Sequence, residues 1–344
     1  MVKRKDKKEI LYINILRILA CFLVVINHTN GYVLNYGGLG ETVFYSLIFS
    51  VCKIGVAVFL MITGALVLGK EYDFKKVTKC IVRVLLPAVV ISLILYIEGS
   101  GGIGNANIIT FLGSFLQKPY ILPYWYIYAL VGIYLALPFL QKMIKNFKEK
   151  DYLWFILLFL ILPSILTLIT TYVHININAN FQIAFFPSIV AMVVCGKFIS
   201  VIKMSKKYFV ISIVVFMLSW VLMFLSMFIP YLIDGKLSYA LDAWNSLPVI
   251  LMAMATFYIV RYIYEKRMMS EKIEIIISAI ASTTFGIYLV HYVLNYRIYS
   301  VRIFQNFFGA CPIVAVIALD VATFVVCMII VYILKKIPII KKYL

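Results

Sequence analysis

Two histidines and an arginine lie inside long apolar segments, where an ionisable side chain is costly and usually functional. Arg17 and His28 belong to NILRILACFLVVINHT, and His291 belongs to STTFGIYLVHYVLNY, one helical turn after Tyr288. On a helix, the separation of Arg17 from His28 corresponds to roughly 20° around the axis and about 16 Å along it. This places a cation in the cytoplasmic half and two imidazoles at the same depth near the outer end, which suits an anionic ligand that enters from the cytoplasm, with chemistry at the far side. For Arg17 or His28 alone, the alternative is a snorkelling cation or a residue that ends a helix.

Other candidates are less specific. Lys53 lies within a span and needs an anionic partner or a wet cavity, for which Glu98, Asp242 and Asp320 are candidates. Arg83 lies at the start of a predicted span and can either bind a phosphate or belong to the basic loop residues that set the membrane topology. The Thr63-Gly64 pair is typical of close helix packing. Trp125, with Tyr126 and Tyr128, is typical of an outer aromatic belt.

The elements that must position these residues are membrane helices. The chain has 344 residues, of which 64% are hydrophobic and 13% charged, and apolar stretches recur along its whole length. Inside a bilayer the backbone must satisfy its own hydrogen bonds, so each stretch predicts a helix. We therefore predict an all-α polytopic membrane protein, a single domain over residues 1–344 with a basic tail at 1–8 and no appended soluble domain. Ten spans are expected: 9–30, 43–68, 76–98, 121–141, 152–173, 181–201, 208–230, 240–262, 273–296 and 312–334. Segment 106–119 is too short to span and is expected at the interface.

The formal charge of +18 is explained by topology. Of 32 Lys and Arg residues, 26 fall in the N-terminal tail and in segments 70–83, 142–150, 197–207, 261–272 and 335–342. These segments alternate with nearly neutral loops, which is the positive-inside pattern, and an even number of spans places both termini in the cytoplasm. The excess charge also favours anionic membrane lipids. A nucleic-acid partner is not expected.

In order along the chain, these motifs resemble the acyltransferase 3 family of integral-membrane acyltransferases, over essentially the whole sequence. The resemblance rests on Arg17 and His28, Phe59 with Thr63-Gly64, Arg83 with Pro87, Trp125 with Tyr134 and Pro138, and Gly286, Tyr288 and His291. Thr63-Gly64 stands where the family often has Ser-Gly, which keeps the hydroxyl. The chain is most similar to short bacterial members that act on surface polysaccharides.

The resemblance implies transfer of an acyl group, usually acetyl, from cytoplasmic acyl-CoA to a hydroxyl or amine of an extracytoplasmic glycan or lipid-linked sugar, in the bacterial cell membrane. Such a reaction needs a base and groups that stabilise an oxyanion. We expect His28 to be the general base or a transient acyl carrier, with His291 and Tyr288 orienting it, the acceptor or the oxyanion. Arg17, Arg83 and Lys53 are the candidates for binding CoA, and Trp125, Thr63 and Glu98 for binding the acceptor.

The sequence also bears on metals, on alternative functions and on the identity of the substrates. With three histidines and no HExxH motif, the sequence offers no obvious metal site, and acyl-CoA is the one small-molecule partner expected. A transporter or exporter of a polysaccharide or metabolite is the main alternative, because intramembrane ionisable residues also mark permeation pathways. The acyl group, the acceptor and the oligomeric state are not readable from the sequence.

Overall fold

The computed structural model describes residues 2–175, 187–266 and 269–344, and all its regular elements over these residues are helices. In chain order they are α1 Val2–Thr29, η1 Asn30–Tyr36, α2 Leu39–Cys52, α3 Ile54–Val67, α4 Phe74–Gly99, η2 Ile103–Asn105, α5 Ile108–Gln117, η3 Leu122–Tyr124, α6 Trp125–Ile144, α7 Glu149–Ile156, η4 Leu157–Ile161, α8 Leu162–Val173, α9 Ser188–Val201, α10 Lys206–Asp234, α11 Leu247–Lys266, α12 Glu271–Ala281, α13 Thr284–Tyr299, α14 Arg302–Ala310, α15 Pro312–Leu334 and α16 Pro338–Lys341.

Within the described residues, eight helical stretches are long and apolar enough to cross a membrane, and a bent pair formed by α12 and α13 makes a ninth. The prediction of an all-α polytopic membrane protein is confirmed. The remaining predicted span, 181–201, corresponds to the shorter apolar helix α9, and its first six residues lie outside the described part of the chain. The count of ten therefore stays a prediction.

Two predicted spans are interrupted. The span at 43–68 consists of α2 and α3, which meet at Lys53, and the span at 273–296 consists of α12 and α13, which meet at a 51° bend. The span predicted at 240–262 begins later, at Leu247. The preceding helix, α10, continues to Asp234 and stops before Gly235, whose φ of +71° is the left-handed conformation that suits glycine at a helix end. The predicted interfacial segment forms the ten-residue helix α5.

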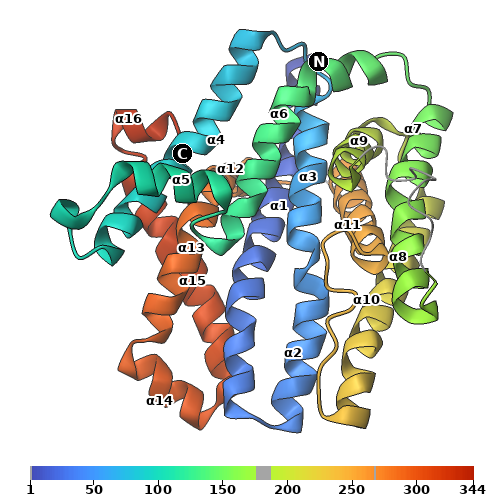
Figure 1. The fold of residues 1–344 in the computed structure, drawn as a ribbon. Helices are drawn as coiled ribbons and strands as arrows, with labels where there is room; N and C mark the ends of the chain where they lie inside the picture. Colours follow the sequence, from blue (N-terminus) through green and yellow to red (C-terminus); the bar gives the residue numbers. More distant parts are fainter. Residues whose placement is uncertain (1, 176–186, 267–268) are drawn as a thin grey trace.

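The centre of the bundle is formed by α1 and α3, with α13 and α15 on one side and α9 and α11 on the other (Figure 1). Helices α3 and α9 approach closely at Gly64 and Gly196. A Cβ on Gly64 would lie 1.7 Å from the carbonyl oxygen of Val193, and one on Gly196 would lie 2.0 Å from that of Met61. Only glycine allows this backbone contact, which agrees with the packing role predicted for the Thr63-Gly64 pair.

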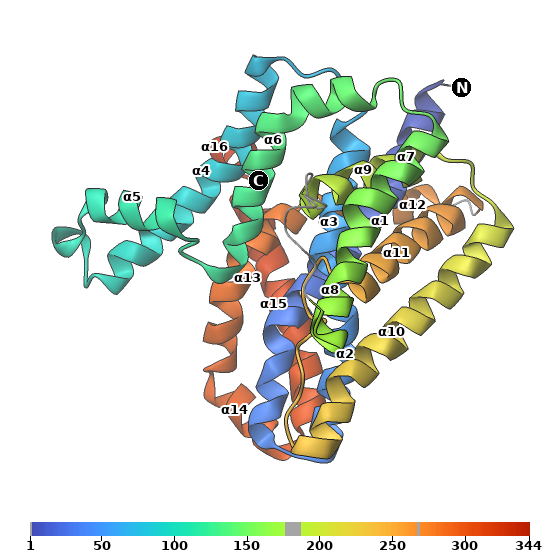
Figure 2. The same ribbon diagram turned by 45° about the vertical axis from the view of Figure 1, so that its right-hand side comes forward.

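The basic connections gather at one end of the bundle. The N-terminus and the connections between α3 and α4 and between α6 and α7 lie at the top of Figure 1, whereas α14 and the start of α2 lie at the bottom. The same separation is visible after rotation in Figure 2. By the positive-inside rule, the top is the cytoplasmic end. The C-terminal segment containing α16 lies beside α4 in both views.

Candidate active site

A cavity of about 590 Å³ opens among α1, α3, α4, α6 and α13, with residues of the C-terminal segment at its edge. Five basic side chains line this cavity: Arg17, Lys70, Arg83, Lys335 and Lys341. We call it the donor cavity, because Arg17 and Arg83 are among the residues for which the sequence predicts binding of the acyl donor. Over the described part of the chain, no Asp or Glu is among its lining residues. The remaining wall is largely aromatic and aliphatic, so the cavity combines concentrated positive charge with an apolar body.

The positive charges are close enough to act on one another. Burial, followed by the charges of Arg83 and Lys341, lowers the pKa of Lys335, which lies just after the span of α15. The Lys335 Nζ atom donates a hydrogen bond to the carbonyl of Ser282, 2.6 Å away. Cations held together without an acidic partner favour an anionic ligand, since the ligand relieves their mutual repulsion.

Tyr288 connects the donor cavity to the histidines. Its side chain lines the cavity, and its ring centroid lies 5.7 Å from that of Tyr126 and 5.8 Å from that of His291. The Tyr288 hydroxyl donates a hydrogen bond to the carbonyl of Pro123. Because this hydroxyl hydrogen is engaged, Tyr288 contributes position and its oxygen lone pairs to the site.

The two histidines form a pair. The ring centroids of His28 and His291 are 5.4 Å apart, and Tyr292 packs edge-on against His28 at 5.3 Å. His291 is fully buried, and its Nδ1 lies 2.7 Å from the carbonyl oxygen of Tyr288. A carbonyl only accepts, so this contact assigns the hydrogen to Nδ1 and leaves Nε2 with a free lone pair. Nε2 is buried and has no hydrogen-bond partner within the described residues, so it is available as a proton acceptor.

Side chains from two other helices hold the end of α1 around His28. The Asn295 Nδ2 atom on α13 donates a hydrogen bond to the His28 carbonyl, 3.2 Å away. The next residue, Thr29, hydrogen bonds to the carboxyl of Asp320 on α15, and both residues are buried. A buried carboxyl inside a membrane helix is costly and therefore informative. The sequence indicated Asp320 as a candidate partner of Lys53, whereas its contact in the structure is with Thr29, the residue beside His28.

Some of the predicted site residues line the donor cavity and others lie outside it. Arg17, Arg83, Thr63 and Tyr288 line the donor cavity, and the Thr63 hydroxyl also donates to the Phe59 carbonyl at 3.0 Å. Arg17 and His28 both face α13, since one shares the cavity with Tyr288 and the other contacts His291.

Lys53, Glu98 and Trp125 do not line the donor cavity. The Lys53 Nζ atom lies 3.2 Å from the carboxylate of Asp242, which identifies its partner among the three candidates. The Glu98 carboxylate pairs with Arg297 at 2.8 Å, and Trp125 stacks on Trp244 with ring centroids 6.2 Å apart. The roles predicted for these residues in binding CoA or the acceptor stay predictions.

One sequence interpretation was wrong. Tyr126 was assigned to an outer aromatic belt with Trp125 and Tyr128, but it is 7% exposed and lines the donor cavity beside Tyr288. The Pro123 segment sets this placement, because α6 starts directly after it and turns successive aromatic residues in different directions. Sequence reasoning also missed Lys70, Lys335 and Lys341 as site residues, since basic residues near span ends are expected for topology alone.

The fold and the site define an integral-membrane protein with a cationic cavity connected through a tyrosine to a buried histidine pair. The family described as Acyltransferase domain, acyltransferase 3, matches residues 10–332, nearly the whole chain, and the protein belongs to this family. The predicted resemblance is confirmed, and the protein is an acyltransferase. Neither the curated proteins nor the solved structures contain a match to this sequence.

Proposed function

We propose that the protein transfers an acetyl group from cytoplasmic acetyl-CoA to a hydroxyl of an extracytoplasmic glycan, in the bacterial cell membrane. The observation that carries the proposal is the donor cavity, in which five cations and no acidic side chain among the described residues lie at the cytoplasmic end of the bundle. CoA carries several phosphate groups at one end and a thiol at the other, joined by a long, flexible chain. Its phosphates suit Arg17, Arg83 and Lys335, because charge-assisted hydrogen bonds to phosphate are the strongest that these side chains make.

The thioester end of acyl-CoA would reach past Tyr288 to the histidine pair. In this mechanism, His28 removes the proton from the acceptor hydroxyl, and the oxygen attacks the thioester carbonyl. The carbon–sulfur bond breaks, and the proton returns from the imidazole to the leaving thiolate, which gives an ester and free CoA. His291 packs against His28 and orients it, and its unpartnered Nε2 is free to accept a hydrogen bond from the acceptor hydroxyl, while Asn295 and the Thr29–Asp320 contact fix the end of α1.

The test separates donor binding from chemistry. Purified protein is supplied with radiolabelled acetyl-CoA, and binding is measured for wild type, Arg17→Gln, His28→Ala and Lys145→Gln. Lys145 is an exposed lysine at the same end of the bundle that does not line the cavity, so it controls for loss of one charge. We expect Arg17→Gln to weaken acetyl-CoA binding at least tenfold, as expected for a charge-assisted hydrogen bond worth about 1.5–3 kcal/mol. His28→Ala and Lys145→Gln should bind normally.

Chemistry is then followed in cells. Envelope glycans from a deletion strain carrying wild type, His28→Ala or Lys145→Gln are compared by mass spectrometry for O-linked acetyl groups. Acetylation should be restored by wild type and Lys145→Gln and lost with His28→Ala. Acetylation that persists in the deletion strain, or that returns with His28→Ala, would contradict the proposal. So would equal acetyl-CoA binding by wild type and Arg17→Gln.

A further inference from the structure

A second cavity, of about 900 Å³, lies on the flank of the bundle among α7, α9, α10 and α11. It shares no lining residue with the donor cavity. Its wall is mainly apolar, with contributions from Phe198, Ile202, Ile211, Val215 and Met254. Tyr208 and Ile211, on its outer edge, are 55% and 44% exposed, so this flank groove, as we name it, opens sideways toward lipid.

The cytoplasmic end of the flank groove is polar and basic. Lys203 lines it and is exposed, and within the described residues this side chain forms no hydrogen bond or ion pair. Exposed Lys206 and Lys207 follow in the first turn of α10. Among the described residues that line this groove, Glu149, the first residue of α7, is the one acidic residue. The local balance is therefore positive.

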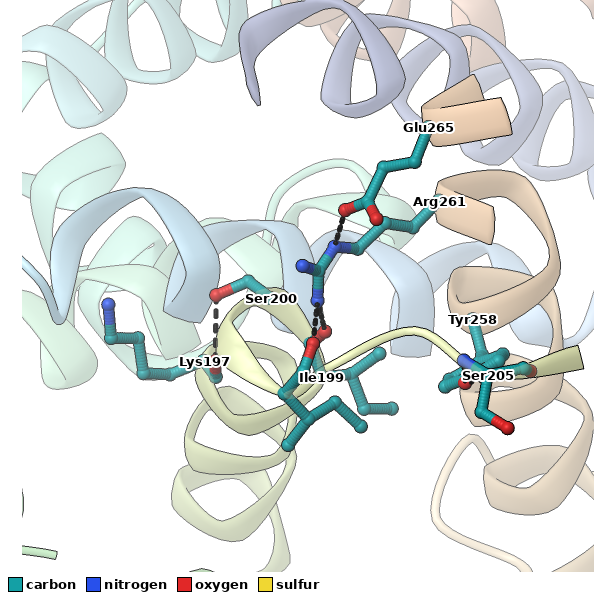
Figure 3. Close-up of polar contacts among 8 residues, drawn as sticks. Lys197, Ile199, Ser200, Ser205, Tyr258, Arg261 and Glu265 are labelled. Atoms are coloured by element: carbon teal, nitrogen blue, oxygen red, sulfur yellow. Dashed lines mark hydrogen bonds and ion pairs between the residues drawn. The ribbon is translucent and has the colours of Figure 1, made fainter. Parts of the chain in front are cut away.

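The segment that carries Lys203 is fixed to α11 (Figure 3). The Arg261 guanidinium donates hydrogen bonds to the carbonyl of Ile199, in the last turn of α9, and to that of Ile202, directly after α9, the latter at 3.1 Å. The backbone N–H of Ser205 donates to the Tyr258 hydroxyl at 2.8 Å. Since residues on both sides of Lys203 are held, the lysine is presented at a defined place above the apolar wall.

We propose that the flank groove binds one anionic phospholipid of the cytoplasmic leaflet, with an acyl chain along the apolar wall and the phosphate at Lys203. Three observations support it: the groove opens to lipid, its wall is apolar, and its basic end lies among the cytoplasmic connections, where headgroups are found. Each basic residue near an anionic headgroup contributes about 1 kcal/mol, so the positive surplus selects a lipid with net negative charge. The proposal does not depend on the acyl-transfer function.

Native mass spectrometry of the full-length protein, released from mild detergent after exchange into mixed micelles, tests this proposal. The probes are phosphatidylglycerol and phosphatidylcholine with identical acyl chains. The variants are Lys203→Ala, Lys203→Arg and Lys272→Ala, the last of which removes an exposed lysine on α12 away from the groove. A second pair, Ser212→Phe and Ser212→Ala, places a bulky ring in the path of the acyl chain or leaves the groove open, because Ser212 lines its wall.

Wild type should retain one phosphatidylglycerol in preference to phosphatidylcholine. Lys203→Ala should weaken this binding about fivefold, equivalent to about 1 kcal/mol, whereas Lys203→Arg and Lys272→Ala should leave it unchanged. Ser212→Phe should abolish retention, and Ser212→Ala should preserve it. Equal retention of the two lipids, or an equal effect of Lys203→Ala and Lys272→Ala, would overturn the selection of an anionic headgroup. Retention by a folded, monodisperse Ser212→Phe protein would overturn the assignment to this groove.

Discussion

Replacing His291 with phenylalanine should separate the activity of this protein from its stability. Phenylalanine keeps a ring of similar size between His28 and Tyr288 but removes both nitrogens. The variant loses the hydrogen bond from Nδ1 to the Tyr288 carbonyl, which costs about 0.5–1.5 kcal/mol. It also removes Nε2, an unpartnered buried acceptor whose burial costs about 1–3 kcal/mol. The free energy of unfolding should therefore stay nearly constant or rise by up to about 2 kcal/mol.

Activity should behave differently. Loss of an imidazole that takes part in proton transfer, or that positions the group that does, lowers turnover at least about 10²-fold. We expect His291→Phe to release CoA from acetyl-CoA at less than about a hundredth of the wild-type rate, with acetyl-CoA binding unchanged because His291 is not a lining residue of the donor cavity. Thermal unfolding in detergent gives the stability, and thiol release gives the rate.

The control is His174→Asn, which alters an exposed histidine whose φ of +57° asparagine tolerates, and which should change neither quantity. Turnover of His291→Phe within threefold of wild type would refute the functional role of Nε2. Parallel losses of activity and stability would refute the interpretation that the buried nitrogen is retained for function at a cost.

Asp320→Leu should lower kcat about tenfold or more without weakening acetyl-CoA binding, because Thr29 loses its partner next to His28. Asp320→Asn keeps a hydrogen-bond acceptor and should retain most of the wild-type rate. An equal loss of kcat in both variants would contradict a positioning role for Asp320. Lys335→Gln should raise KM for acetyl-CoA severalfold with kcat unchanged. Because the pKa of Lys335 is lowered, its charge is lost as pH rises. The KM of the wild type for acetyl-CoA should therefore increase at alkaline pH, and the KM of Lys335→Gln should increase less. Identical pH profiles of KM would exclude a contribution of the Lys335 charge to acetyl-CoA binding. Gly64→Ala should reduce the free energy of unfolding by about 1–3 kcal/mol through collision with the Val193 carbonyl, whereas Gly132→Ala, which meets nothing within 4 Å, should not; chemical denaturation of both variants decides this.

The parts of the fold that follow from composition were predictable from the sequence. The length of each apolar stretch predicts a membrane helix, and the basic loops predict the orientation of the helices in the membrane. Both depend on the local free energy of transfer into the bilayer. The breaks at Lys53 and after Ala281 were not predictable, since both segments read as continuous apolar spans. Helix interruptions inside a membrane depend on tertiary contacts that satisfy the freed backbone groups, and these contacts are remote in sequence.

The site was predictable only in part, for the same reason. Arg17, His28 and His291 were indicated because an ionisable residue within a span is conspicuous. The short distance between His28 and His291 was expected from their similar depth. The contact between Thr29 and Asp320 joins residues on the first and the fifteenth helix, and no spacing in the sequence predicts it. Tyr126 was misassigned because the sequence around an aromatic residue at a span end is the same whether the side chain faces lipid or a cavity.

The bend between α12 and α13 joins the two halves of the site. When a helix ends, its last carbonyls lose their intrahelical partners and need other donors. The Lys335 Nζ atom supplies one of these donors at the carbonyl of Ser282, and the same lysine lines the donor cavity. The bend also brings Thr284, Phe285 and Tyr288 to the cavity wall, one turn before His291. The Ser282 carbonyl at the bend is therefore satisfied by Lys335 of the donor cavity, and α13 continues from the bend to His291. Thr284, Tyr288 and His291 all lie on α13, so the direction that the bend gives to α13 sets the position of the cavity wall and of the imidazole together.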